Sequence, residues 1–217
     1  MLSLTEENYL KAIYHLSQDG AKAVLTNEIA EVMSTKAASV TDMVKRLSGK
    51  GLISYEKYYG VEISKEGKLE ALMVIRKHRL WETFLVEKLG FNWDEVHDVA
   101  EQLEHIQSPL LIEKLDAFLG NPSADPHGHP IPDKNGRIKE VRQMPLTEVA
   151  AGKSALVCSV RNSSPSFLQY LSKIGVQIGV KIAIVSKEEF DGSMEAMINN
   201  KKTFVTREVA DNILVRG

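Results

Sequence analysis

The sequence has a single cysteine, Cys158, so the chain cannot form an intramolecular disulfide. No window approaches the roughly 18 consecutive apolar residues that a membrane-spanning helix requires. The first residues form an amphipathic pattern rather than a charged and then apolar signal. These absences argue against a disulfide-stapled secreted module and a membrane protein, and they favour the reducing cytoplasm. Cys158 lies in an apolar strand-like run, which indicates packing.

The chain also lacks a strong bias of charge. A net charge of -2 at pH 7 argues against binding nucleic acid through a bulk positive field. The charges are unevenly placed, however. Seven Lys or Arg stand against four Asp or Glu between Lys36 and Lys68, whereas residues 97–116 carry many carboxylates and one lysine. This distribution suggests one anionic partner and one cationic partner.

The first 64 residues predict a winged helix-turn-helix. Apolar residues recur at helical spacing in three segments, residues 4–18, 25–33 and 36–50. Thr5 and Thr26 are the expected N-caps, and Gly51 stops the third helix. The period then changes to two in residues 52–56 and 60–64, which indicates a hairpin. Three helices and a hairpin form a winged helix-turn-helix, whose third helix enters the major groove.

The third predicted helix carries a polar side opposite its apolar side. We expect DNA contacts from this helix and the wing tip, at Lys36, Ser39, Thr41, Asp42, Lys45, Arg46, Lys50, Lys57 and Tyr58. Serine and threonine suit phosphates and thymine methyl groups, and lysine and arginine suit phosphates. A solvated face on an ordinary three-helix core would look the same. No residue offers an obvious bidentate guanine contact, so the operator sequence does not follow.

Beyond residue 64 the pattern predicts a helical section and then a small barrel. Long helices are expected at 65–88 and 93–119, and residues 120–136 hold four of the seven prolines and no helical pattern. Short strands follow, with one helical insert at 166–174; the strands are 155–160, 181–185, 195–198, 203–206 and 212–215. This spacing suggests an SH3-like barrel. We predict an α+β, mainly α fold with domains 1–64, 65–142 and 143–217.

Five of the six histidines lie between His78 and His129. At about 100° per residue, one arc of the predicted 93–119 helix gathers four donors, His97, Glu101, Glu104 and His105. On the preceding helix His78 and Glu82 are four apart and project together. Imidazoles and carboxylates without a thiolate favour Mn(II) or Fe(II), although Zn(II) or Co(II) would bind in vitro. The alternative is a solvated helix face.

Four motifs stand out along the chain: Glu7-Asn8-Tyr9-Leu10 with Ile13-Tyr14, Arg76-Lys77-His78-Arg79-Leu80, Val96-His97-Asp98 with Glu104-His105, and Asp125-Pro126-His127-Gly128-His129-Pro130-Ile131-Pro132. In these motifs and in the order of its elements, the whole chain resembles the DtxR/MntR family of metal-dependent repressors. The resemblance implies a helical metal-binding and dimerisation segment and, as in longer members, a final SH3-like domain. It also implies a homodimer on a pseudo-palindromic operator that controls metal-uptake genes.

The resemblance implies two metal sites. One would join the first helix to the Glu-His pair, through Asn8, Glu101, Glu104 and His105. The second resembles His78, Glu82 and His97, to which the linker would add Asp125 and His127. A metal in the first site would connect the DNA-binding domain to the dimerisation helices, restrict the hinge and favour the spacing that DNA requires.

Three positions qualify this expectation. Glu101 stands where iron-responsive members have cysteine, and a hard oxygen ligand favours Mn(II). Asn8 stands where the family often has Asp or Met. Lys11 stands where the short manganese sensors add a Glu, and a charged lysine has no lone pair to donate. This argues against the two-metal site of those sensors.

Two other functions fit parts of the pattern. A metal hydrolase also gathers histidines and carboxylates, but the sequence has neither an HExxH motif nor a nucleophile elbow, and the donors are spread across a hinge. A winged-helix regulator that senses a small organic ligand would be indifferent to chelators.

Overall fold

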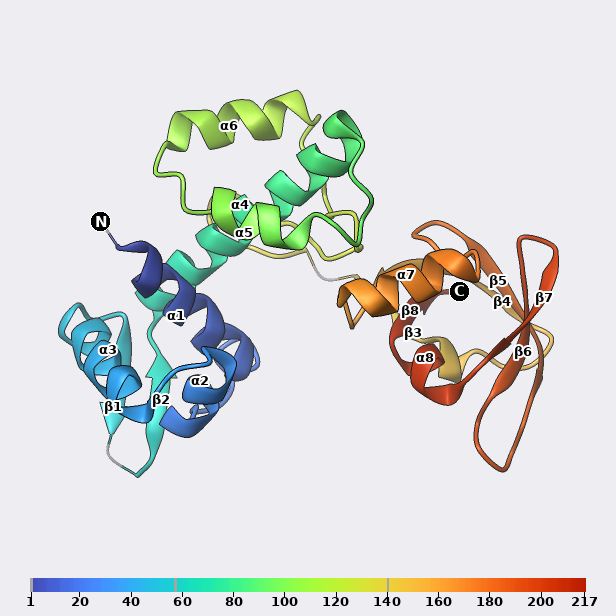
Figure 1. The fold of residues 1–217 in the computed structure, drawn as a ribbon, viewed down its shortest axis with the longest axis horizontal. Helices are drawn as coiled ribbons and strands as arrows, with labels where there is room; N and C mark the ends of the chain where they lie inside the picture. The colour runs from blue at the N-terminus through green and yellow to red at the C-terminus, as the bar shows by residue number, and fades with distance from the viewer. Residues whose placement is uncertain (1, 57, 140) are drawn as a thin grey trace. The chain divides into compact units, whose positions relative to one another are not determined.

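The computed structural model describes residues 2–56, 58–139 and 141–217 (Figure 1). The chain forms two compact units. The first unit comprises residues 1–78, 101–109 and 132–138, and the second comprises residues 79–100, 110–131 and 139–217. Two helices, α4 (Lys65–Leu89) and α5 (His97–Leu103), contribute residues to both units.

Three helices and a hairpin open the first unit, as the sequence predicts. They are α1 (Leu4–Leu16), α2 (Thr26–Val32), α3 (Ala37–Gly49), β1 (Ile53–Glu56) and β2 (Gly60–Ile63). The strands are antiparallel, with Ile53 opposite Ile63, and Figure 1 shows the hairpin beside α3. Gly51 has the expected left-handed conformation after α3, with φ of 72°.

Both predicted N-caps are wrong by one or two residues. Ser3, rather than Thr5, caps α1 through a capping box, because its hydroxyl accepts from Glu6 N and the Glu6 carboxylate accepts from Ser3 N. Leu25, rather than Thr26, precedes α2, and its backbone N donates to the Glu28 carboxylate. In both helices a glutamate at the third position decides where the helix begins.

One apolar core holds these elements together. The fully buried side chains include Leu10 and Ile13 of α1, Ile29 of α2, and Val44 and Leu47 of α3. Burial of each such side chain contributes about 1.5–3 kcal/mol. This core fixes which side of α1 and α3 remains available for polar contacts.

The predicted helix at 93–119 is wrong, because two helices stand there. α5 ends at Leu103, and α6 (Pro109–Phe118) begins at a proline. Proline disfavours a helical residue before it and is tolerated in the first helical turn. Glu104 and His105 therefore lie after α5 rather than on its face. Among the described residues, no helix combines the length and apolar character of a membrane span.

The second unit contains a six-stranded antiparallel sheet in the order β3-β8-β4-β5-β6-β7. Its elements are β3 (Met144–Pro145), η1 (Leu146–Glu148), β4 (Ser154–Val160), α7 (Pro165–Lys173), β5 (Lys181–Lys187), β6 (Met194–Ile198), β7 (Lys201–Val205), α8 (Arg207–Asp211) and β8 (Ile213–Arg216). The five predicted strands and the helical insert are confirmed; β3 and α8 are too short for a periodic signal. Irregular pairing at Val157/Ser159 and Ile184/Ser186 bends the sheet.

We expect Gly67→Ala to destabilise the first unit by at least about 2 kcal/mol. Gly67 lies in the first turn of α4, and a Cβ there would stand 1.9 Å from the carbonyl oxygen of Leu52. Gly49→Ala is the matched control, because a Cβ in α3 at Gly49 meets no heavy atom within 4 Å. Urea unfolding should show this control neutral or slightly stabilised, and equal effects of the two substitutions would contradict the close packing at Gly67.

Candidate metal centre and DNA interface

The exposed side of α3 carries most of the predicted DNA contacts. Ser39, Asp42, Lys45 and Arg46 are exposed, and Lys36 is the exposed N-cap residue. The apolar residues of the same helix are buried in the core. α3 therefore presents a continuous polar and largely basic surface on an element that is rigidly packed from behind.

Thr41 and Lys50 have partners within the protein. Thr41 is half-buried, and its hydroxyl donates to the carbonyl of Ala37, 2.9 Å away. The Lys50 ammonium donates to Glu6 Oε1 at 2.6 Å. This hydrogen bond, helped by one from the Ser3 backbone, holds the pKa of Glu6 below its ordinary value although burial opposes it. Lys50 thus connects the end of α3 to α1.

At the wing tip, Tyr58 is 87% exposed and has φ of 75°. Its exposure agrees with the expected contact to DNA. Lys57, the other predicted wing contact, lies outside the described residues.

A second polar group lies between α1 and the segment that follows α5, within the first unit. Glu7 is buried, and its carboxylate accepts from His105 Nδ1 at 2.6 Å and from Gln107 Nε2 at 2.7 Å. The Lys77 ammonium is 3.6 Å from the same carboxylate. Sequence reasoning singled out His105 but missed Glu7, Lys77 and Gln107 as its surroundings.

Lys11, one turn after Glu7, lies among the carboxylates that the sequence assigned to a metal. Its ammonium is 2.9 Å from Glu101 Oε1 and 2.6 Å from Glu104 Oε1. The other oxygen of Glu104 accepts from His78 Nδ1 at 2.6 Å. The structure therefore brings Glu101 and Glu104 together as predicted, with a lysine between them.

Asn8 and His105 complete the predicted set. Asn8 is half-buried and lines a surface pocket of the first unit with Lys11 and Glu101. His105 Nε2 is 3.6 Å from Glu104 Oε1, while its Nδ1 is bound to Glu7. The four predicted residues therefore lie near one another. The shortest contacts in this group, however, join Lys11 and His105 to carboxylates.

The second unit gathers a separate group of donors around Glu82, which is 2% exposed. Glu82 Oε1 is 3.8 Å from His97 Nδ1, and Glu82 Oε2 is 3.6 Å from His127 Nδ1. His78 precedes Glu82 by one turn on α4. A helix, the start of the next helix and the linker therefore each contribute one donor to this group.

These separations are also compatible with a bound cation. N–H···O hydrogen bonds measure about 2.7–3.2 Å, whereas ligand atoms each about 2.1 Å from one ion lie roughly 3.0 to 3.5 Å apart. The distances at Glu82 exceed the first range by several tenths of an ångström and need only a small contraction to reach the second. The donor set of imidazoles and a carboxylate therefore fits a divalent metal ion.

The linker holds His127 in a defined orientation. His127 Nε2 donates to the Trp93 carbonyl at 2.7 Å, and the two rings stack. This contact directs Nδ1 toward Glu82. A hydrogen bond from the other ring nitrogen commonly fixes the orientation of a histidine ligand in this way. Burial lowers the pKa of His127, but the hydrogen bond and charge of Glu82, together with Asp125 and the Trp93 carbonyl, raise it above its ordinary value overall.

Asp125 braces the linker. Its Oδ1 accepts from the backbone N of His127 and of His129, and its Oδ2 is 3.2 Å from His129 Nδ1 and 3.5 Å from Arg79 Nε. The ligand atoms of Asp125, His127 and His129 lie within 4.8 Å of one another. Asp125 thus contacts the linker itself and Arg79, and these contacts position His127.

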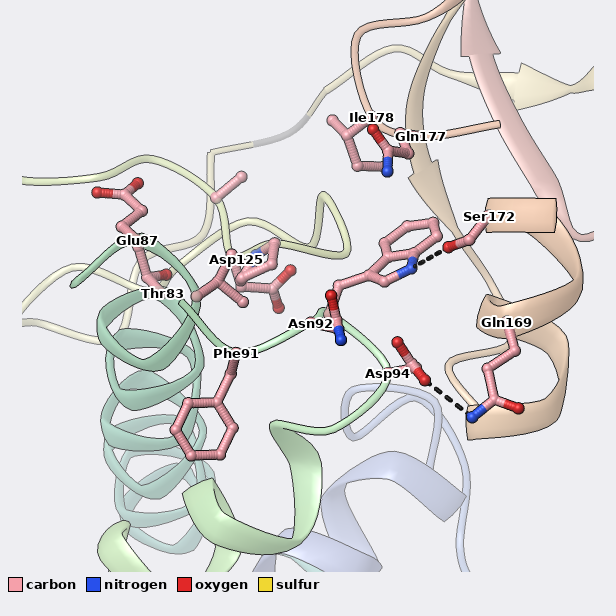
Figure 2. Close-up of a pocket in the computed structure, with 14 residues that line it drawn as sticks. Thr83, Glu87, Phe91, Asn92, Asp94, Asp125, Gln169, Ser172, Gln177 and Ile178 are labelled. Carbon is pink, nitrogen blue, oxygen red and sulfur yellow. Dashed lines mark hydrogen bonds between the residues drawn. The ribbon is translucent and has the colours of Figure 1, made fainter. Parts of the chain in front are cut away.

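A pocket of about 650 Å³ lies beside this linker. Figure 2 shows Thr83 and Asp125 on one wall and Ser172 on α7 on the opposite wall. Two hydrogen bonds connect the Trp93 loop to α7, one from the Trp93 indole to Ser172 and one from the Gln169 amide to Asp94 (Figure 2). Polar and apolar side chains both line the pocket, and side-chain hydrogen bonds connect its walls.

Family models match nearly the whole chain. Residues 1–61 match the N-terminal DNA-binding domain of iron-dependent repressors, residues 64–133 match their metal-binding and dimerisation domain, and residues 144–217 match the FeoA domain. The chain belongs to the DtxR/MntR family of metal-dependent repressors. Within that family it has the longer form, with a C-terminal SH3-like domain.

Two curated relatives are named for their regulation. The iron-dependent repressor IdeR of Mycobacterium leprae is 37% identical over 160 residues, which are 70% of this chain and 69% of that protein. The diphtheria toxin repressor of Corynebacterium glutamicum is 28% identical over 195 residues, 85% of each chain.

Solved structures show the same fold. A manganese-dependent transcriptional repressor in complex with manganese is 32% identical with a TM-score of 0.83, over 97% of this chain and 98% of that one. The manganese regulator SloR is 33% identical with a TM-score of 0.74, over 97% of each chain.

We expect Glu6→Gln to lower the free energy of unfolding at pH 7 by up to about 1 kcal/mol. Glutamine keeps the capping oxygen but loses the charge that Lys50 contacts. Because the folded protein lowers the pKa of Glu6, this stabilisation is present above the unfolded pKa and disappears as the pH falls through the folded pKa. Urea unfolding at pH 7 and near pH 3 should show the difference shrink, with exposed Glu31→Gln as control. A constant difference would contradict this origin.

We expect Glu82→Gln to weaken Mn(II) binding by about 10-fold to 100-fold. The substitution removes the buried negative charge between the two imidazoles but keeps the shape of the side chain. Glu87→Gln is the matched control, because Glu87 lies five residues further along α4 and is exposed. Equilibrium dialysis measures the affinity, and equal affinities for the two variants would show that the ion binds elsewhere.

Proposed function

We propose that the protein is a DNA-binding transcriptional repressor activated by a divalent metal ion. The observation that carries this proposal is the buried Glu82 carboxylate between His97 and His127, in a chain whose first unit exposes the polar side of α3. Family membership supports it, because the similar proteins are named as iron-dependent and manganese-dependent repressors.

Mn(II) is the proposed effector, and Fe(II) is the second choice. The donors are imidazole nitrogens and carboxylate oxygens, which suit these ions. Cys158 takes no part, since its sulfur contacts Gln143 and the Leu214 carbonyl, and burial raises the pKa of its thiol. Zn(II) and Co(II) would bind the same donors in vitro, and the similar structure of ScaR has bound zinc.

Glu82, His97 and His127, all of the second unit, are the proposed ligands, and His78, one turn before Glu82 in the sequence of α4, stays a prediction from the sequence. When bound, the ion would supply the positive charge that holds these side chains at one point. Asp125 and Trp93 act on His127, the first through the linker backbone and the second through its carbonyl. Metal binding would then reduce the freedom of α4, α5 and the linker relative to one another.

DNA recognition requires two copies of the chain. A single winged helix reads one half-site, so a homodimer on a pseudo-palindromic operator is proposed. An apolar groove in the second unit suits the dimer contact; it is lined by Trp81, Phe84, Leu111, Lys114, Leu115, Ala117 and Phe118. The regulated genes would be those of metal uptake. Because the partner is genomic DNA, we place the protein in the cytoplasm.

A regulator of the same architecture could instead respond to a small organic molecule. The pocket beside the linker, about 650 Å³, falls within the range of small-molecule sites. A chelator separates the two possibilities, because it would not affect binding to DNA if the effector were organic.

We expect binding to the DNA upstream of the protein's own gene and of metal-transporter genes to require metal. Fluorescence anisotropy with chelator, Mn(II), Fe(II) and Zn(II) in parallel should show Mn(II) increasing the affinity by more than about tenfold. Glu82→Gln should lose this increase and Glu87→Gln should keep it. Equal affinity with chelator and with metal would refute metal activation and would leave the organic effector.

A further inference from the structure

We propose that the ammonium of Lys11 stands in place of a metal ion between the Glu101 and Glu104 carboxylates. It joins α1 to residues 101–104 without a metal ion. The family resemblance assigns a metal to these carboxylates, and the proposed function needs only the ion at Glu82. The expected content is therefore one regulatory metal ion per subunit. All residues of the Lys11 cluster belong to the first unit.

The geometry of the cluster is that of a cation held by two carboxylates. Lys11 Nζ is 2.9 Å from Glu101 Oε1 and 2.6 Å from Glu104 Oε1. An ammonium has three hydrogens, so it can donate to both oxygens at once. These are the charge-assisted distances at which lysine binds carboxylate strongly.

The burial of these side chains makes the pairing important for the stability of the fold. The side chain of Glu104 is 0% exposed, and that of Lys11 is 15% exposed. A buried carboxylate without a matching charge is strongly destabilising. Glu104 Oε1 is paired with Lys11 and Oε2 with His78, so both of its oxygens have a donor within the protein.

A metal ion would have to displace Lys11 to reach the same oxygens. A divalent ion within a few ångströms of an ammonium is repelled, and moving Lys11 away would remove a cation that both Glu101 and Glu104 contact. Asn8, the predicted ligand from α1, is neutral and adds no negative charge to compensate. His105 is held by Glu7 through Nδ1. The four predicted ligands therefore form a weaker metal-binding site than their spacing in the sequence suggests.

Glu7 and Lys11 act together on α1. They are four residues apart and so lie on one side of the helix. Glu7 accepts from His105 and Gln107, and Lys11 donates to Glu101 and Glu104. The Glu7 carboxylate thus meets donors and the Lys11 ammonium meets acceptors, all of them on residues 101–107. These contacts fix α1 without any exchangeable ion.

Counting bound Mn(II) tests the proposal directly. Electron paramagnetic resonance, which detects free Mn(II), should show one ion bound per wild-type subunit. In the Glu82→Gln variant it should show no ion bound at Glu101. Adding Lys11→Met should create a site in the Glu82→Gln protein, with an increase in affinity of at least about tenfold. Adding Glu101→Gln to that double variant should abolish the new site. Lys11→Arg, which keeps the charge, should create none.

Thermal unfolding in chelator tests the structural role independently of metal. Lys11→Met should lower the midpoint by roughly 5 °C or more, Lys11→Arg by less, and exposed Lys22→Gln not at all. Mn(II) should restore part of the loss in Lys11→Met, because the ion replaces the missing cation.

Two results would overturn the proposal. The first is a Glu82→Gln protein that binds Mn(II) at wild-type strength, loses it with Glu101→Gln and is indifferent to Lys11→Met. The second is an unchanged midpoint of Lys11→Met in chelator. Both measurements are made without DNA, so a failure of metal-dependent repression would not be mistaken for a failure of the Lys11 assignment.

Discussion

Three buried carboxylates, Glu7, Glu82 and Glu104, impose the constraint on which the polar architecture of this protein depends. Each is at most 5% exposed. A carboxylate removed from water needs positive charge and hydrogen bonds from its surroundings, or it destabilises the fold. The protein meets this need with its own lysines and histidines at Glu7 and Glu104. At Glu82 the facing groups are two imidazole nitrogens at longer distances.

This difference separates a structural role from a regulatory one. A lysine ammonium is attached to the chain, so its local concentration does not depend on the cell, and the contact that it makes is permanent under ordinary conditions. A metal ion bound by imidazoles and a carboxylate is exchangeable, and its occupancy follows the free concentration. Under the proposed function, only a group of the second kind responds to the concentration of free metal.

Local signals predicted most of the fold and part of the site. The helical and strand periods identified α1–α3, the wing and five strands, because the apolar faces of these elements are visible in short windows. The single helix predicted over residues 93–119 is wrong, because the apolar pattern continues on both sides of Ser108 and Pro109, where the helix breaks. The partners of Lys11 could not be predicted from spacing, since Glu104 lies 93 residues away. A lysine and a glutamate four apart on α1 were the available signal, and such a pair more commonly faces solvent.

The linker shows how a histidine in a region without regular structure can be held in a fixed orientation. His127 is held on both sides by main-chain contacts: its Nε2 donates to the Trp93 carbonyl, and its own carbonyl accepts from Val160 N of β4 at 3.1 Å. The next residue, Gly128, has φ of 84°, and a Cβ there would stand 1.9 Å from the carbonyl oxygen of Cys158. Only glycine allows the linker to approach β4 so closely. The imidazole is consequently oriented by β4, which would give the C-terminal domain a physical part in the proposed metal centre although it supplies none of the proposed ligands.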